Sequence, residues 1–92
     1  TQNDYKTKVL EILTTQDKKN AFQNIRQLLA DSKVTDFSDL FRLMFDTVDD
    51  WGKGHIAECI LILSKYQQSD AIVVDKEINV MAMFVELIGS IK

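Results

Sequence analysis

The sequence predicts an all-α protein, a five-helix bundle that forms a single domain over residues 1–92. Three observations support this prediction. The chain contains no proline, its apolar residues recur at helical spacing in every long segment, and no segment sustains the alternation of apolar and polar residues that is typical of a half-buried strand. A chain of this length can build one modest core, which buries roughly 60–65% of the surface that the unfolded chain exposes.

The first two expected helices each have one apolar face. In the first helix the apolar positions repeat at i, i+4, i+7 and i+8, and they are Tyr5, Val9, Ile12 and Leu13. This pattern should end near Thr14 and Thr15. Asp17 has a side chain suited to cap a second helix. The buried face of that helix is expected to contain Ala21, Phe22, Ile25, Leu28 and Leu29.

A third helix is expected to begin at Thr35 and Asp36, whose oxygen atoms can accept the free N–H groups of a first turn. Its apolar residues are Phe37, Leu40, Phe41, Met44, Phe45 and Val48. Gly52 and Gly54 should then interrupt the chain, because each glycine disfavours a helix by about 1 kcal/mol relative to alanine. A fourth helix is expected to start at residues 53–55, with an apolar stripe of Ile56, Cys59, Ile60, Leu63 and Tyr66.

The last helix is expected to start near Asp75, after a connection at the polar residues 67–70, and to run to the C-terminus. Only Asn79 and Glu86 are polar between Ile78 and Ile88. Rotation by about 100° per residue divides the apolar positions into two sets. The first set is Ile78, Met81, Ala82, Val85 and Ile88, and the second is Val80, Phe84, Leu87 and Ile91.

One set can face the domain's own core, and the other needs a second cover. That cover is either the centre of the bundle or another subunit, because a helix that is apolar nearly all round indicates burial and does not identify what buries it. The second set is the candidate subunit interface, and it consists of Val80, Phe84, Leu87 and Ile91.

Composition and charge favour a soluble protein of the cytoplasm. The chain is 46% hydrophobic and 27% charged, which is ordinary for a globular domain, and no apolar run reaches the roughly 18 residues of a membrane span. The lone Cys59 is expected to be reduced and buried. A net charge of −3 argues against direct contact with nucleic acid. The chain starts at Thr1 without an initiator methionine, so we expect a processed product, a trimmed chain or a fragment of a longer protein.

Local motifs do not predict a phosphate or metal site. Gly52-Lys53 lacks the preceding glycine and the following Ser or Thr of a phosphate-binding loop, because positions 47 and 54 are Thr47 and Gly54. A calcium loop aligned from Thr47 to Glu58 would have threonine and tryptophan at two ligand positions, which leaves too little oxygen for tight binding. His55 and Glu58 form one i, i+3 pair, whereas zinc needs three or four ligands.

Catalytic residues are not predicted either. A Ser or Cys nucleophile needs a base held by a third group, and the only histidine lies beside glycines. The carboxylates are scattered over helix starts and polar faces, where exposed Asp and Glu residues are usual. We therefore predict no catalytic, cofactor-binding or metal-binding residue in this chain.

Three segments of the second half carry a family resemblance. They are Trp51-Gly52-Lys53-Gly54-His55-Ile56-Ala57, Tyr66-Gln67-Gln68-Ser69-Asp70-Ala71, and Asp75-Lys76-Glu77-Ile78-Asn79 with the apolar run to Ile91. The chain resembles the C-terminal collar domain of replication factor C clamp-loader small subunits, most closely the ATPase subunit of tailed bacteriophages. The resemblance extends from about Val9 and is strongest from Leu40 onward. The main feature of the resemblance is the spacing from Ala71 to Asp75, followed by Asn79 in an apolar helix.

The resemblance implies a role in assembly. In clamp loaders, collar domains from five subunits associate and hold ATPase modules in a spiral, and these modules use ATP and Mg to open a sliding clamp and place it on primed DNA. The expected partners of this chain are therefore other clamp-loader subunits. The clamp and primer-template DNA would be contacted only by modules that this chain lacks, so the family's catalytic residues correspond to no position here.

Two other classes remain alternatives. The chain could be a free-standing helical adaptor that binds a partner protein through the second apolar stripe. It could also be a small enzyme or metal-dependent module, although the ligand and base sets for these functions are missing. A phosphate-binding loop and an acidic Mg-binding motif encoded upstream of Thr1 would favour the clamp-loader interpretation.

Overall fold

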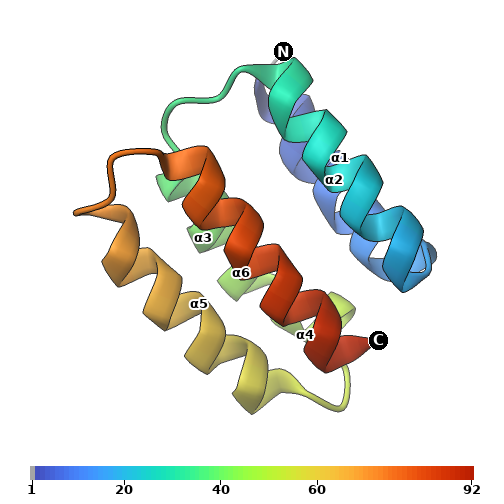
Figure 1. The fold of residues 1–92 in the computed structure, drawn as a ribbon. Helices are drawn as coiled ribbons and strands as arrows, with labels where there is room; N and C mark the ends of the chain where they lie inside the picture. Colours follow the sequence, from blue (N-terminus) through green and yellow to red (C-terminus); the bar gives the residue numbers. More distant parts are fainter. Residues whose placement is uncertain (1) are drawn as a thin grey trace.

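The computed structural model describes residues 2–92, with side chains described from Tyr5 onward. The chain folds as helices joined by short connections, which confirms the all-α fold class and the single domain of the prediction (Figure 1). The helices are α1 (Gln2–Thr15), α2 (Lys18–Ser32), α3 (Ser38–Asp46), α4 (Val48–Trp51), α5 (Ile56–Asp70) and α6 (Lys76–Ile91).

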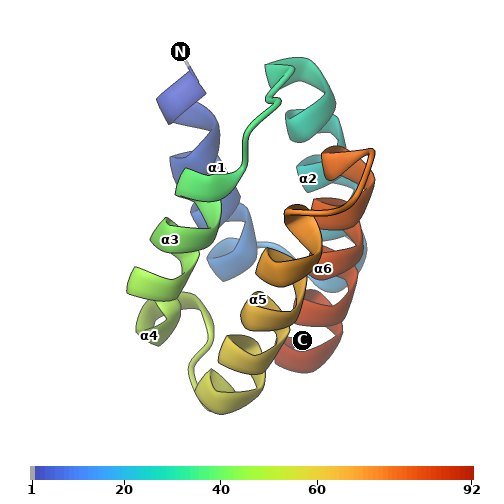
Figure 2. The ribbon, with the colours of Figure 1, turned by 90° about the vertical axis from the view of Figure 1, so that its left-hand side faces the viewer.

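The helices surround one core in a closed order. α1 and α2 form an antiparallel hairpin, and α2 packs on α6. α6 packs on α5, and α5 packs on α3 and α4. Both α3 and α4 also contact α1, which closes the order. Figure 2 shows α1, α3 and α4 on one side of the molecule and α2 and α6 on the other. Each helix can therefore bury one face against two neighbours and still present another face to the outside.

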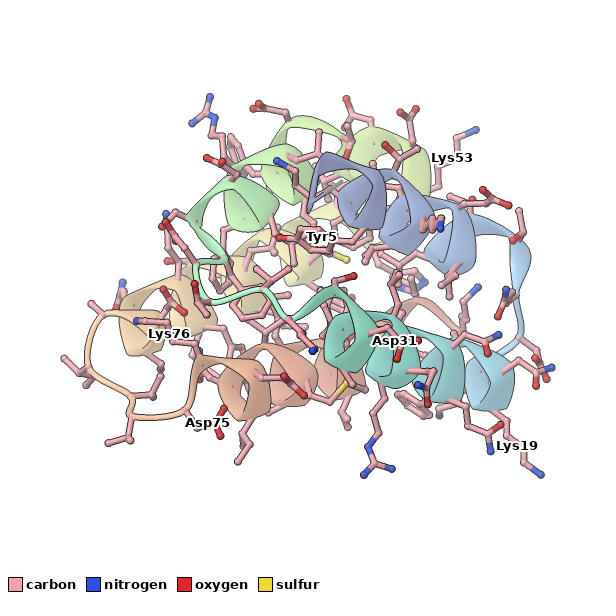
Figure 3. The ribbon with its side chains drawn as sticks, turned by 90° about the horizontal axis from the view of Figure 1, so that it is seen from above. Tyr5, Lys19, Asp31, Lys53, Asp75 and Lys76 are labelled. Carbon is pink, nitrogen blue, oxygen red and sulfur yellow. The ribbon has the colours of Figure 1, made fainter. Side chains whose placement is uncertain are left out.

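The core is a single cluster to which every helix contributes. Its largest fully buried side chains are Phe37, Phe84, Leu13, Ile25, Leu29, Leu40, Met44, Met83, Leu87, Ile88, Val9 and Val80. Tyr5 is also buried, and Figure 3 shows its side chain directed from α1 into the bundle. Burial raises the pKa of Tyr5 to about 12, and the nearby carboxylates of Asp39 and Asp36 add to this effect. No polar residue is buried among the side chains described.

The expected third helix is divided in two, so the bundle has a short additional helix. α3 ends at Asp46 and α4 begins at Val48. The Thr47 hydroxyl donates to the carbonyl of Leu43 at 2.7 Å, and the backbone of Thr47 (φ −111°, ψ 12°) departs from helical geometry. A side chain that bonds back to a helical carbonyl in this way competes with the regular ladder. α4 closes on the core through Trp51, whose indole N–H donates to the carbonyl of Met44 at 3.1 Å.

The predicted interruption at the two glycines is confirmed. Gly54 has φ +84°, a left-handed conformation that glycine adopts without a steric cost. Gly52 lies where α4 and α5 approach closely, because a Cβ atom at this position would be 3.0 Å from the carbonyl oxygen of Val48 and 3.2 Å from the sulfur of Cys59.

The connection before the last helix was misplaced by the sequence analysis. Residues 67–70 form the last turn of α5, and the connection consists of residues 71–75. The polar side chains of this turn are compatible with an exposed helix end, whereas the apolar Ile72 and Val74 lie in the loop. Asp75 is the N-cap of α6, as predicted, and its carboxylate accepts from the N–H of Ile78 at 3.2 Å. Asp17 caps α2 in the same way, through Asn20 at 3.4 Å.

Candidate functional site

The four residues of α6 that were predicted to form a subunit interface face the domain's own core. Val80, Phe84 and Leu87 are fully buried in the domain's own core, and Ile91 is partly buried against it. Assigning these four residues to a subunit interface was therefore wrong. The exposed positions come from the other set: Ile78 is 68% exposed and Val85 is 51% exposed.

The helical spacing of α6 could not decide between these roles. The buried arc also includes Met83 and Ile88, and it faces the interior because α5 and α2 both pack against α6. Ile88 belongs to the first set and is fully buried, so that set is divided between the core and the surface. A helical projection gives the angle between two residues on one helix, and only the neighbouring helices determine which angle points to the core.

The outer apolar residues of α6 line a hollow against α2. The two helices run antiparallel (Figure 1), and a hollow of about 670 Å³ lies between Phe22 on α2 and Met81 and Val85 on α6. A smaller hollow continues along the groove to Ile78. We define the α2/α6 surface as Phe22, Ile78, Met81 and Val85. The apolar part of the lining of the main hollow consists of Phe22, Ala30, Met81 and Val85.

Polar and charged side chains form the rim of the α2/α6 surface. On the α2 side the rim contains Gln23, Arg26 and Gln27, and on the α6 side it contains Glu77. The described residues include no ion-pair partner of Arg26. An apolar floor with a polar rim is the usual anatomy of a protein-interaction patch.

The polar strip of α6 faces α5 and takes no part in this surface. Asn79 donates to the carbonyl of Tyr66 at 3.2 Å, and Glu86 forms an ion pair with Lys65 at 2.9 Å. The hydrogen bond from Lys65 lowers the pKa of Glu86, and the same bond raises the pKa of Lys65. These contacts hold α5 against α6 on the side opposite α2.

A second, smaller hollow of about 230 Å³ lies between α3 and α5. We define the α3/α5 surface as Phe45 and Ile60 with the hollow between them. Phe45 is 45% exposed, which makes it the most exposed aromatic side chain of the described residues. The guanidinium of Arg42 lies 5.5 Å from the centre of the Phe45 ring and 3.2 Å from a carboxylate oxygen of Asp46.

Of the groups that were weighed for chemistry, the structure brings His55 and Glu58 together. His55 Nδ1 and Glu58 lie 3.6 Å apart and both are partly exposed. Residues 48–51 of the rejected calcium loop are helical, so they cannot wrap an ion. Cys59 is fully buried, and burial raises the pKa of its thiol. Among the described residues, no three His, Cys, Asp or Glu side chains gather as a metal site. No described helix is long and apolar enough to cross a membrane.

Sequence reasoning assigned Phe22 and Phe45 to buried faces and so missed their part in these surfaces. Both residues occupy apolar positions one helical step from core residues, Ala21 and Met44. In α2 six of fifteen residues are apolar, which is ordinary for a helix with one buried face, so the sequence carries no signal that sets Phe22 apart. Comparison of the chain with models of protein families, with curated proteins and with solved structures finds no match. The surfaces themselves must therefore guide the functional interpretation.

Proposed function

We propose that this chain is an assembly domain that binds neighbouring protein through its α2/α6 surface, and that it serves as a collar domain of a clamp-loader ATPase subunit. The observation that carries the proposal is the apolar floor of the α2/α6 surface, which lies outside the core. Ile78 and Val85 together with Phe22 and Met81 form one patch, and such a patch is typical of an interaction site.

The clamp-loader part of the proposal rests on the resemblance of residues 51–57, 66–71 and 75–91 to collar domains. In this role the partners are collar domains of adjacent subunits. ATP and Mg would be bound by ATPase modules of the parent protein, and contact with the sliding clamp and with DNA would also belong to these modules. The proposal implies a location in the cytoplasm, which is the host cytoplasm if a phage encodes the protein.

Self-association of the 92-residue chain tests the assembly role. Sedimentation should detect weak association at about 1 mM chain, the concentration at which contacts of about −4 kcal/mol become half occupied. Val85→Asp should abolish it, because the carboxylate would be desolvated on binding. Thr7→Asp adds the same charge on an exposed position of α1 and should leave association unchanged. If the unsubstituted chain stays monomeric, or if both variants weaken association equally, the assembly role of this surface is rejected.

The coding region upstream of residue 1 tests the clamp-loader assignment separately. A phosphate-binding loop and an acidic Mg-binding motif within about two hundred residues, the length of one or two domains, are expected. An upstream region without them would reject the clamp-loader assignment but not the assembly role.

The groove between α2 and α6 also suits the second candidate, an adaptor that receives an amphipathic helix of another protein. Two antiparallel helices with an apolar floor and a polar rim are the geometry that this mode of recognition uses. A chain that stays monomeric but binds a foreign helix in a manner sensitive to Val85→Asp would support the adaptor.

A further inference from the structure

We propose that the α2/α6 surface binds an acidic amphipathic helix of a partner protein, with the apolar stripe of that helix in the hollow and its carboxylates against the α2 rim. This inference rests on the proposal that the α2/α6 surface binds protein, and it adds the chemical class of the partner. The shape of the site suits a helix, because α2 and α6 run antiparallel over 15 and 16 residues. This length matches a partner helix of about four turns.

The charges of α2 are divided between its two flanks. Its cations are Lys18, Lys19 and Arg26. Rotation by about 100° per residue places all three within about 60° of Phe22, which lines the hollow against α6. The one carboxylate of α2, Asp31, lies about 180° from Phe22, where it lines a different hollow against α1. The flank of α2 that faces α6 is therefore cationic and has no carboxylate of its own.

Arg26 is the central cation of the site. It lines both the main hollow and the smaller hollow that continues to Ile78, and no described carboxylate lies within ion-pair distance of it. The arginine of the α3/α5 surface differs, because Arg42 is paired with Asp46 at 3.2 Å. A guanidinium without a partner in its own domain can bind a carboxylate of another molecule through two parallel hydrogen bonds.

The carboxylates of α6 do not neutralise the middle of the site. Glu86 lies on the side of α5, where it pairs with Lys65 at 2.9 Å. Of the two hollows of this surface, Glu77 lines only the smaller one, from the first turn of α6. A partner helix with carboxylates opposite Arg26 and Lys19, and without one near Glu77, has the complementary pattern of charge.

Two synthetic peptides of about 15 residues, or about four helical turns, test the inference. Both have leucines at i, i+3, i+4 and i+7 and are held helical by a lactam bridge on the outer face, and the positions beside the leucines are glutamate in one peptide and lysine in the other. Fluorescence anisotropy should show that the glutamate peptide binds the unsubstituted chain about tenfold more tightly than the lysine peptide. The net charge of −3 would favour the opposite order if only overall charge acted, so this preference reports a local site.

Matched variants assign the binding to the α2/α6 surface. Arg26→Glu should weaken binding of the glutamate peptide about tenfold and tighten binding of the lysine peptide, because the sign of the central charge is reversed. Lys53→Glu makes the same change of charge on the side of the molecule opposite Lys19 (Figure 3) and should leave both affinities unchanged. Val85→Ser removes apolar surface from the floor without adding charge and should weaken binding of both peptides. The three substituted residues are exposed, so circular dichroism should find every variant folded.

Three outcomes would overturn the inference. The first is equal binding of the two peptides. The second is an equal effect of Lys53→Glu and Arg26→Glu, since the preference for acidic peptide would then come from no site on α2. The third is displacement of the glutamate peptide by single-stranded DNA as readily as by unlabelled peptide, which would mean that the site recognises negative charge alone.

Two further outcomes separate this inference from the assembly function. If neither peptide binds at about 1 mM while the chain associates with itself through Val85, the inference is rejected and the assembly role of the surface stands. If the glutamate peptide binds with the expected dependence on Arg26 and Val85 while the chain stays monomeric, the inference stands and the assembly role is replaced by that of an adaptor.

Discussion

The inner and outer faces of α6 are alike in composition and opposite in environment. The inner face has Val80, Met83, Phe84, Leu87 and Ile88, all fully buried. The outer face has Ile78 and Val85, which are exposed, and Met81, which is partly buried. Hydrophobicity is therefore a poor guide to which face stabilises the fold. The inner face is stabilised by contact with its own domain, whereas the outer face gains comparable burial only if another molecule covers it.

The adjacent residues Phe84 and Val85 provide the strongest test of this comparison. Phe84→Ala should lower the free energy of unfolding by about 3–5 kcal/mol, because it removes a fully buried ring and leaves a cavity. Val85→Ala should change it by less than about 0.5 kcal/mol, as is usual at exposed positions. Urea unfolding followed by circular dichroism measures both. Equal losses for the two variants would show that the outer face is buried in the isolated domain.

Two glycines extend the comparison to the backbone. Gly52→Ala should destabilise the fold by about 1–3 kcal/mol, because the new methyl group would crowd the carbonyl of Val48 and the sulfur of Cys59. Gly89 lies on the outer side of α6 with open space at its Cβ position. Gly89→Ala should stabilise the helix by about 0.5–1 kcal/mol. Thermal unfolding of the two variants shows whether each substitution lowers or raises the stability of the fold. A stabilising Gly52→Ala would mean that α4 and α5 are not closely packed.

These contrasts show which features of the fold could be predicted from the sequence. The caps Asp17 and Asp75 were found because capping is a local hydrogen bond between residues three positions apart. The orientation of α6 was reversed because it depends on how α6 packs against α2, which is distant in the sequence, and against the preceding helix α5. The division at Thr47 was missed because it depends on a hydroxyl that bonds within its own helix, an interaction that leaves the apolar spacing unchanged.

The candidate surfaces were harder to predict than the fold. Each hollow is formed by two helices that are not consecutive in the sequence, α2 with α6 and α3 with α5. The exposed Ile78 and Val85 could be recognised as belonging to a second apolar stripe. Phe22 and Phe45, which line the two hollows, had the spacing of core residues and became recognisable only once the helices were packed. The resemblance to clamp-loader collar domains remains a prediction.

Substitution of Asp75, the N-cap of α6, tests how much the first turn of the helix contributes to the stability of the fold. The outer face of α6 begins in this turn. Asp75→Ala should cost about 1 kcal/mol, because the N–H of Ile78 loses its acceptor. The first turn contains Ile78 of the outer face and no residue of the buried arc, so no core packing should be lost with it. Asp75→Asn keeps an oxygen acceptor and should cost only a few tenths of a kcal/mol. Chemical unfolding of the unsubstituted chain and of the two variants measures these free-energy differences. A loss of stability several times larger than about 1 kcal/mol for Asp75→Ala would show that this turn also anchors the core.

The smallest effect is expected on the polar strip between the two faces, where Glu86 pairs with Lys65. The hydrogen bond from Lys65 lowers the pKa of Glu86 in the folded state, so the pair stabilises the fold above the unfolded pKa of about 4.3. This contribution is lost as the pH falls through the lower, folded-state pKa. Glu86→Gln should therefore lower the unfolding temperature slightly at neutral pH, and the difference should vanish in acid. A difference that persists at a pH well below 4 would indicate that Glu86 acts through packing instead of charge. High salt should shrink the neutral-pH difference, because both side chains are about half exposed and their interaction is screened.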